Sequence, residues 1–293
     1  MIKLIASDMD GTLLNNNHKI SEKNLQAIKA AQEAGLTFMI ATGRGYRSVK
    51  DLLDKNGIKC SCILMNGSEI RDEDGNILTQ IQLSKEKIRK VVDILAPYNI
   101  VINFMTAAGS AVINTKEEIT NDWVERLSYH SPNLTVEERE NIIKKFHLLE
   151  DKIYINGLEE LLSSDMVINK IEAFYGDSQE VLKINETLRQ IEGLAVASAT
   201  ETSIEVTDIK AQKGIILEEY IKQIGLKKEE VIVFGDSFND ESLFDLFPYS
   251  FATANAMDGI KEKAYRVIES NHDDGVGKTI LELLEKQKTE IVD

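Results

Sequence analysis

The sequence is poor in the residues and runs that mark several protein classes. Its 293 residues include only 3 prolines, 2 cysteines and 1 tryptophan. With so little proline and 17 glycines, collagen-like and disordered chains are disfavoured. No apolar run approaches the roughly 18 residues of a membrane span. The start of the chain lacks a cationic segment followed by a long apolar stretch, so we expect no secretory signal and a cytoplasmic protein.

Positive charge is also scarce. Lys and Arg number 34 against 49 Asp and Glu, a formal net charge of −15. Such a chain is repelled by phosphate backbones and anionic lipid, so we expect neither nucleic acid nor a membrane as its partner. No feature indicates an obligate protein partner. The length exceeds one small domain, and about 150 residues per domain suggests two.

The two cysteines, Cys60 and Cys62, are separated by a single residue. A disulfide across this spacing would be strained, and zinc would need two further soft ligands that are not found nearby. We therefore interpret both as small core or strand residues.

Strand-like and helix-like patterns alternate at both ends of the sequence. Short apolar runs at 3–7, 36–41, 61–65 and 231–234 predict buried strands, and amphipathic stretches between them predict helices. This alternation predicts βαβ units, hence an α/β fold with a Rossmann-like, mostly parallel sheet. A hairpin signal, Asp74-Gly75-Asn76, follows the third run.

The middle of the chain has shorter, mixed elements. Predicted strands lie at 101–104, 111–114, 170–174 and 204–207, and predicted helices at 118–127 and 179–191. The simplest interpretation is an inserted α+β domain at 83–204, which splits a core formed by 1–82 and 205–293.

Polar side chains follow three of the predicted core strands. Asp8 and Asp10 follow the first, Thr42 the second, and Asp236 a late one, with Asp240 close behind. Ligands bind beyond the carboxyl ends of strands in open parallel sheets, so we expect these residues to converge. Carboxylates gathered there repel one another, and a hard cation such as Mg²⁺ relieves that repulsion.

Other residues suit a phosphate group. Thr42 offers a hydroxyl, Gly43 makes nearby backbone N–H groups accessible, and Lys213, followed by Gly214, offers a compact cation. A metal, a carboxylate nucleophile, a second carboxylate and phosphate-binding groups together indicate phosphoryl transfer through an aspartyl-phosphate.

Four motifs occur in the order found in one known superfamily. They are Asp8-Met-Asp-Gly-Thr-Leu-Leu, Ala41-Thr-Gly-Arg, Lys213-Gly and Gly235-Asp-Ser-Phe-Asn-Asp240. The chain resembles the haloacid dehalogenase superfamily, and within it the Cof-type phosphatases, whose α/β cap lies between the second and third motifs. The resemblance covers the core and, by size and position, the insert.

The resemblance implies a role for each matching residue. Asp8 would attack phosphorus, and Asp10 would protonate the leaving group and then deprotonate the attacking water. Mg²⁺ would bind Asp8, the backbone carbonyl of Asp10 and Asp236, with Asp240 in its outer shell. Asn239 would contact phosphate or orient Lys213. The implied function is a Mg²⁺-dependent phosphatase of small phosphorylated metabolites, such as sugar phosphates or nucleotides, whose cap determines the substrate.

Two alternatives stay open from the sequence. One is a phosphotransferase, such as a phosphohexomutase of the same superfamily. The other is a phospho-aspartate signalling receiver, although a receiver has no reason to carry so large an insert. The sequence indicates neither the substrate nor the oligomeric state. Arg44 and Arg47 are interpreted as solvated loop arginines.

Overall fold

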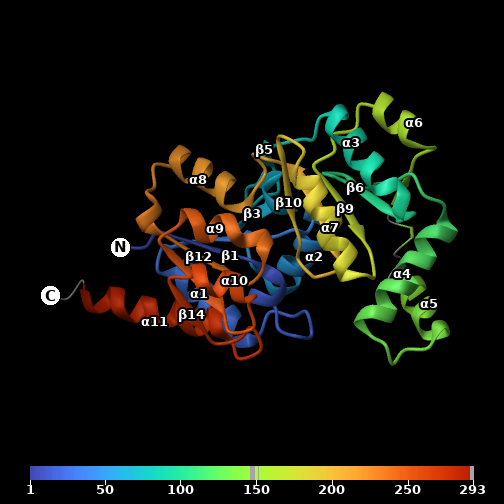
Figure 1. Ribbon diagram of the computed structural model, residues 1–293. Coiled ribbons are helices and arrows are strands. Elements are labelled where there is room, and N and C mark those ends of the chain that lie inside the picture. The colour runs from blue at the N-terminus through green and yellow to red at the C-terminus, as the bar shows by residue number, and fades with distance from the viewer. Residues whose placement is uncertain (146–148, 151, 291–293) are drawn as a thin grey trace. The chain divides into compact units, whose positions relative to one another are not determined.

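The computed structural model describes residues 1–145, 149–150 and 152–290. The chain divides into two compact units, one made of Met1–Gln80 with Lys210–Asp293 and one made of Ile81–Ile209 (Figure 1). The unit boundaries expected from the sequence, 82/83 and 204/205, differ from these by two and five residues. The larger shift arises because the strand β11 (Ser203–Asp208) pairs with strands of the second unit along its whole length.

The first unit is built on an eight-stranded sheet. Its strands from β14 to β3 are parallel, and β4 and β5 add an antiparallel hairpin at one edge. This sheet confirms the predicted α/β class and the hairpin at Asp74–Asn76. In spatial order the strands are β14 (Arg266–Ile268), β13 (Tyr249–Thr253), β12 (Val231–Gly235), β1 (Leu4–Ser7), β2 (Thr37–Ala41), β3 (Ser61–Leu64), β4 (Glu69–Arg71) and β5 (Ile77–Gln80).

Helices cover both faces of this sheet. The helices of this unit are α1 (Glu22–Glu33), α2 (Tyr46–Asn56), α8 (Lys213–Gln223), α9 (Glu241–Leu246), α10 (Asp258–Lys263) and α11 (Gly275–Glu290). α1 packs against α11 on one face, and α8 packs against α9 on the other (Figure 1). The central strands are buried on both sides, so they are continuous apolar runs without alternation.

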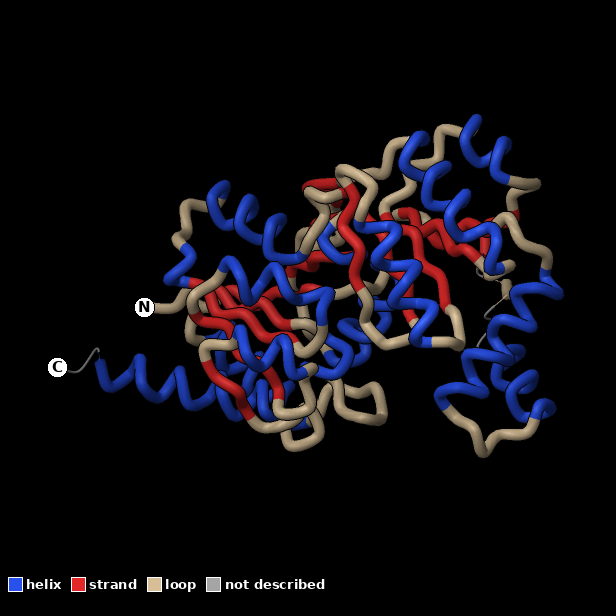
Figure 2. The backbone as a smooth tube through the Cα atoms, in the orientation of Figure 1, coloured by secondary structure: helices blue, strands red, loops and turns tan. Residues whose placement is uncertain are grey.

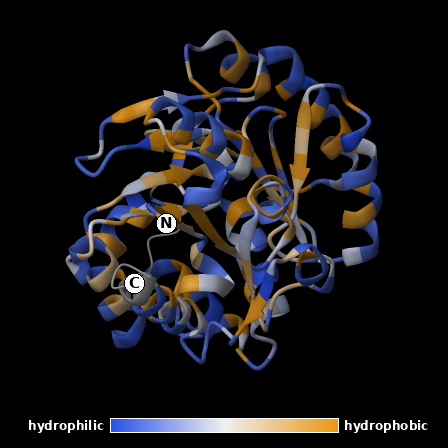
Figure 3. Ribbon diagram, turned by 90° about the vertical axis from the view of Figure 1, so that its left-hand side faces the viewer, coloured by the Kyte–Doolittle hydropathy of each residue, from blue (hydrophilic) through white to orange (hydrophobic). Residues whose placement is uncertain are grey.

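Local sequence explains where the first helices begin and end. The Ser21 side chain accepts a hydrogen bond from the Asn24 backbone N–H at 3.1 Å and so caps α1. α2 ends at Gly57, whose left-handed φ of 63° suits a residue without a Cβ. Ile28, Ala31 and Val49 are buried in the core against β1 and β2. In Figure 3 the hydrophobic colour gathers on the strands, while much of the helix and loop ribbon is hydrophilic.

The second unit has its own six-stranded sheet and core. Most of its strand pairs are antiparallel, and among the described strands of this unit only β7 and β8 pair in parallel. Figure 2 shows the strands of the chain in red and its helices in blue. In spatial order the strands are β10 (Leu194–Ala197), β11, β9 (Lys170–Phe174), β6 (Ile102–Thr106), β7 (Gly109–Val112) and β8 (Lys152–Tyr154). The helices are α3 (Lys85–Leu95), α4 (Lys116–His130), α5 (Val136–Lys145), α6 (Leu158–Ser163) and α7 (Ser178–Arg189).

The fold places both cysteines in the core. Cys60 and Cys62 are buried and unbridged, as predicted for core residues. Among the described residues, none of the helices is both long and apolar enough to cross a membrane.

Candidate active site

The first and last acidic motifs leave the sheet side by side. β1 and β12 are parallel neighbours with Ser7 opposite Phe234, and the Asp8 backbone N–H donates to the Phe234 carbonyl at 3.0 Å. Asp8 follows β1 directly, and Asp236 follows β12 directly. Residues 8 and 236 are thus brought to one carboxyl edge of the sheet, as the strand-end argument predicts.

Lys213 joins this edge from the start of α8. Its Nζ lies 2.6 Å from Asp8 Oδ1 and 2.6 Å from Asp240 Oδ1, and its side chain is fully buried. One ammonium therefore partly neutralises two buried carboxylates. Burial alone would lower the pKa of Lys213, but the charges of Asp240 and Asp8 outweigh it and raise the pKa above its usual value.

Three carboxylates form a cluster whose negative charge exceeds the single positive charge of Lys213. Asp8, Asp236 and Asp240 each offer one oxygen, and these oxygens all lie within 4.8 Å of one another. Burial raises the pKa of Asp8 well above its ordinary value, against the lowering effect of Lys213, and neighbouring carboxylates raise it further. Burial and the charge of Asp240 raise the pKa of Asp236 to about 7. The cluster has the oxygen ligands and the excess negative charge that suit a hard cation.

Hydrogen bonds hold the two later carboxylates in place. Asp236 Oδ1 accepts from the Thr12 hydroxyl at 2.6 Å, which ties the first motif to the last. Asp240 Oδ2 accepts the backbone N–H groups of Asp236 at 3.0 Å and Ser237 at 3.3 Å. Both oxygens of Asp240 are therefore engaged, one by Lys213 and one by the loop. Thr12 was not among the sequence-predicted site residues, although it stands inside the first motif.

Arg44 contradicts its sequence interpretation. Its guanidinium binds the Asp10 carboxylate through two bonds, Nε to Oδ2 at 2.7 Å and Nη2 to Oδ1 at 2.5 Å. The Arg44 side chain is 28% exposed, so it is not a solvated loop arginine. Asp10 itself lies at the rim, with a side chain 46% exposed. The reason for the correction is spatial: the loop after β2 and the turn after β1 lie next to each other at the same sheet edge.

Thr42 and Asn239 contact the polypeptide around the cluster. Buried Thr42 accepts the Arg44 backbone N–H on its hydroxyl at 3.2 Å, and its carbonyl accepts the Asn66 N–H at 3.1 Å. The Asn239 amide nitrogen lies 3.4 Å from Asn66 Oδ1, and its oxygen accepts the Ser237 hydroxyl at 2.8 Å. Asn66 is a buried, left-handed residue (φ 60°). Gly43 lies between Thr42 and Arg44 in the same loop.

Two glycines permit close approaches that assemble the edge. Gly11 has φ +78°, and a Cβ there would lie 2.8 Å from Asp236 Cγ. Gly67 has φ +104°, and a Cβ there would lie 2.6 Å from the backbone of Gln212, next to Lys213. Any side chain at either position would push apart segments that meet at the cluster.

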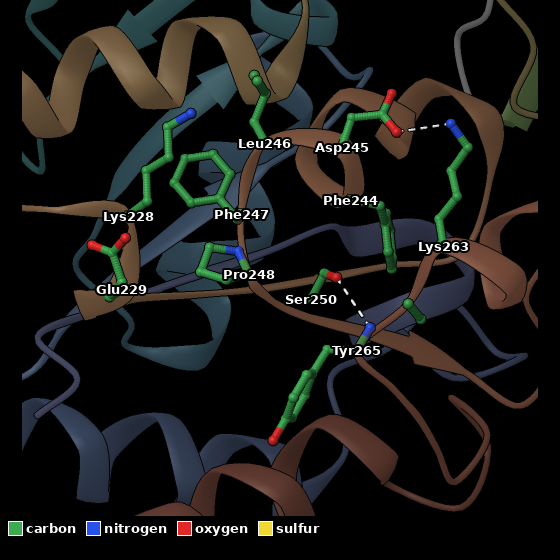
Figure 4. Close-up of a pocket in the computed structure, with 11 residues that line it drawn as sticks. Lys228, Glu229, Phe244, Asp245, Leu246, Phe247, Pro248, Ser250, Lys263 and Tyr265 are labelled. Carbon is green, nitrogen blue, oxygen red and sulfur yellow. Dashed lines mark hydrogen bonds and ion pairs between the residues drawn. The ribbon is translucent and has the colours of Figure 1, made fainter.

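A separate cavity of about 420 Å³ lies at the opposite end of the same strands (Figure 4). Its lining includes Lys228 and Pro248, which precede β12 and β13, and Tyr265, which precedes β14. None of the predicted site residues contributes to it. The site residues predicted from the sequence therefore lie at the carboxyl edge of the sheet and not in this cavity.

Comparison with known proteins identifies the family. The sequence matches the haloacid dehalogenase-like hydrolases over residues 5–280. The chain belongs to this family. It is 28% identical to the phosphatase YwpJ of Bacillus subtilis, an alignment covering 97% of this chain and 100% of that protein. It is 30% identical to the 5-amino-6-(5-phospho-D-ribitylamino)uracil phosphatase YwtE of the same organism, covering 98% and 99%.

The solved structures agree with the sequence comparison. A haloacid dehalogenase-like hydrolase from B. subtilis superposes with a TM-score of 0.83 at 27% identity, covering 95% of this chain and 99% of that one. The resemblance stated from the motifs is confirmed, and so is the enzyme class: this haloacid dehalogenase-like protein is a phosphoric monoester hydrolase. The family match spans both units, which leaves no support for a signalling receiver.

Proposed function

We propose that the protein is a Mg²⁺-dependent phosphatase that hydrolyses small phosphorylated metabolites through an aspartyl-phosphate on Asp8. The observation that carries this proposal is the buried cluster in which Lys213 bridges Asp8 and Asp240 beside Asp236. A nucleophilic carboxylate needs its negative charge, and a cation at this cluster keeps Asp8 ionised despite its burial.

The residues present fit a magnesium ion. Asp8 and Asp236 would bind it directly together with the backbone carbonyl of Asp10, and Asp240 would support it from the outer shell. Asp240 suits the outer position because both of its oxygens are already hydrogen-bonded. A bound Mg²⁺ would offset the carboxylate repulsion and the charge of the phosphate oxygens.

The reaction divides into two steps carried by Asp8 and Asp10. In the first, an Asp8 carboxylate oxygen forms a bond to phosphorus as the bond from phosphorus to the alkoxide breaks, and Asp10 gives its proton to the departing oxygen. In the second, Asp10 takes a proton from water as that water attacks phosphorus and Asp8 is released. Arg44, which binds both oxygens of Asp10, would hold this carboxyl at the rim of the site.

Thr42, Gly43 and Lys213 would hold the phosphate group. The Thr42 hydroxyl and the Gly43 backbone N–H would be neutral donors, and the Lys213 ammonium, which is hydrogen-bonded to Asp8, would supply a positive charge. Asn239 would contribute from the loop after β12, next to Asn66. These donors stabilise charge on the transferring group without adding to the negative charge of the site.

The second unit, Ile81–Ile209, would distinguish substrates as a cap. This assignment agrees with its position between the second and third motifs. The names of related proteins, such as the 5-amino-6-(5-phospho-D-ribitylamino)uracil phosphatase YwtE, favour a small phosphorylated metabolite with a polar or heteroaromatic part.

The test is phosphate release from p-nitrophenyl phosphate and a panel of phosphorylated metabolites, with Mg²⁺ and with EDTA. We expect metal-dependent turnover that is abolished in Asp8→Asn and retained in Asp258→Asn, a matched exchange at an exposed carboxylate. Phosphate passed to a sugar without release of free phosphate would instead identify a phosphotransferase. Turnover in EDTA, or full activity of Asp8→Asn, would refute the proposal.

A further inference from the structure

The turn that carries Asp10 is held through its backbone carbonyls. This turn, Met9–Leu13, contains Gly11 in a left-handed conformation and directs Asp10 and Thr12 to the site. Three carbonyls in and just after the turn accept hydrogen bonds from asparagine side chains. Asn255 donates to the Gly11 carbonyl at 2.8 Å, Asn24 to that of Leu13 at 2.9 Å, and Asn271 to that of Leu14 at 2.8 Å.

The three asparagines are themselves anchored by the last third of the chain. Asn24 Oδ1 accepts the N–H of Gly277 near the start of α11 at 2.8 Å. Asn255 Oδ1 accepts the Asn271 backbone N–H at 2.9 Å, so these two form a linked pair. Asn24 and Asn271 are buried. The residues after Asp10 are thus hydrogen-bonded to two loops, those of Asn255 and Asn271, that belong to none of the four motifs.

The loop that carries Asn255 also touches the last acidic motif. The Met257 backbone N–H donates to the Asp236 carbonyl at 2.9 Å, and the Thr253 hydroxyl lies 3.3 Å from the Gly11 carbonyl. The stretch 253–257 therefore contacts the backbone next to Asp10 on one side and that of Asp236 on the other. A displacement of this stretch moves the two carboxylates relative to each other.

We propose that Asn255, supported by Asn271, is a positioning residue that orients the turn so that Asp10 can protonate the leaving group. The inference rests on the proposed function, because it assumes that Asp10 is the acid. Asn255 does not touch the reacting atoms. It acts by donating to the Gly11 carbonyl, one residue after Asp10, where a rotated peptide would swing the Asp10 side chain away from the leaving oxygen.

The exchange Asn255→Asp separates the two bonds of this side chain. Aspartate keeps an oxygen for the Asn271 N–H but cannot donate to the Gly11 carbonyl, and its charge repels that carbonyl. A second exchange, Thr253→Val, removes the longer bond to the same carbonyl with little change of volume. Asn76→Asp is the matched control, since Asn76 lies in the distant hairpin between β4 and β5.

The measurement compares phenyl phosphate with p-nitrophenyl phosphate in the full chain with Mg²⁺. The two substrates have similar shapes, but phenolate is the more basic leaving group and depends more on a proton donor. The ratio of their kcat/KM values does not depend on the fraction of folded enzyme. A purely structural role would lower both values together, whereas a misplaced acid lowers the value for phenyl phosphate more.

We expect Asp10→Asn to lower the ratio of phenyl to p-nitrophenyl phosphate turnover by about 100-fold, Asn255→Asp by about 10-fold and Thr253→Val by less. Asn76→Asp should leave the ratio unchanged. An unchanged ratio in Asn255→Asp, with Asp10→Asn shifted, would overturn the inference and leave the proposed function standing. If the Asn255→Asp variant cannot be obtained folded, an unchanged ratio in Thr253→Val has the same meaning.

The remaining outcomes bear on the proposed function itself. An unshifted ratio in Asp10→Asn would remove the acid role from Asp10 and with it the basis of the inference. Wild-type protein that hydrolyses neither substrate, or only p-nitrophenyl phosphate, has no working acid for Asn255 to position.

Discussion

The charge of the carboxylate cluster predicts an unusual dependence of stability on pH. The pKa of Asp236 is raised from 3.8 to about 7 in the folded protein, first by burial and then by the charge of Asp240. The folded state therefore binds a proton more tightly than the unfolded state does. Between about pH 4 and pH 7 the metal-free protein should lose stability as the pH rises, because ionised Asp236 is tolerated better in the unfolded chain.

The magnitude follows from the pKa difference. At about 1.4 kcal/mol per pKa unit, the contribution of Asp236 is on the order of 4 kcal/mol at most. Asp236→Asn removes this titration and keeps an oxygen to accept the Thr12 hydroxyl. In EDTA the variant should match the wild type near pH 4 and exceed its free energy of unfolding by up to that amount at about pH 8.

Magnesium should narrow the difference in stability between the two proteins at about pH 8. A ligand at about 100 times its Kd adds about 2.7 kcal/mol to the folded state, and the wild type should gain more than Asp236→Asn, which has lost a carboxylate ligand. The assay is urea unfolding at about pH 4 and about pH 8, with EDTA or with Mg²⁺, and Asp258→Asn as an exposed control. An Asp236→Asn variant that is less stable than the wild type in EDTA at the higher pH would refute the reasoning.

Three further perturbations test other parts of the site. Lys213→Met leaves buried carboxylates without their cation and should lower the free energy of unfolding, measured in urea, by about 3–5 kcal/mol. Lys222→Met, at a side chain 65% exposed, should change it by no more than about 0.5 kcal/mol, and equal losses in the two variants would contradict this. Arg44→Lys keeps the charge but loses the two-pronged bond, so kcat/KM should fall while the melting temperature hardly changes, and unaltered kinetics would show that the pairing is dispensable. Gly11→Ala and Gly35→Ala both place alanine at a positive φ, which costs about 1–2 kcal/mol each, but of these two only Gly11 faces another segment. Phosphatase activity should therefore be lost in Gly11→Ala alone, and an active Gly11→Ala variant would argue against the close packing.

Much of the core could be predicted because its signals are local. The apolar runs that become β1, β2 and β12 end where polar residues begin, and Ser21 and Gly57 mark helix ends by their backbone chemistry. The strand-end argument then needs only the parallel arrangement to bring Asp8 and Asp236 together. The second unit is harder to predict, although the Ser84 cap and the apolar stripe of α3 are local signals of a helix there.

Contacts between side chains distant in sequence could not be predicted in the same way. Arg44 and Asp10 are 34 residues apart, and their pairing depends on which rotamers the two loops allow once β1 and β2 are adjacent. Lys213 and Asp8 are 205 residues apart; residue chemistry assigned both to one phosphate site, but their direct ion pair depends on the fold. Charge and residue type suggest partners of this kind, but the fold selects among them.

Hydrogen bonds to backbone carbonyls are harder still to predict from the sequence, and the asparagine contacts illustrate this. Residue type alone does not distinguish Asn255 from Asn76, and both are exposed asparagines in short loops. They differ in what their amide nitrogens reach: a carbonyl next to the proposed acid for Asn255, and the Asp72 carboxylate within its own hairpin for Asn76. Every residue has a backbone carbonyl, so a search for sequence motifs cannot identify one carbonyl as a hydrogen-bond partner. If the ratio test separates these two asparagines, the groups that orient an acid lie outside the motifs that contain it.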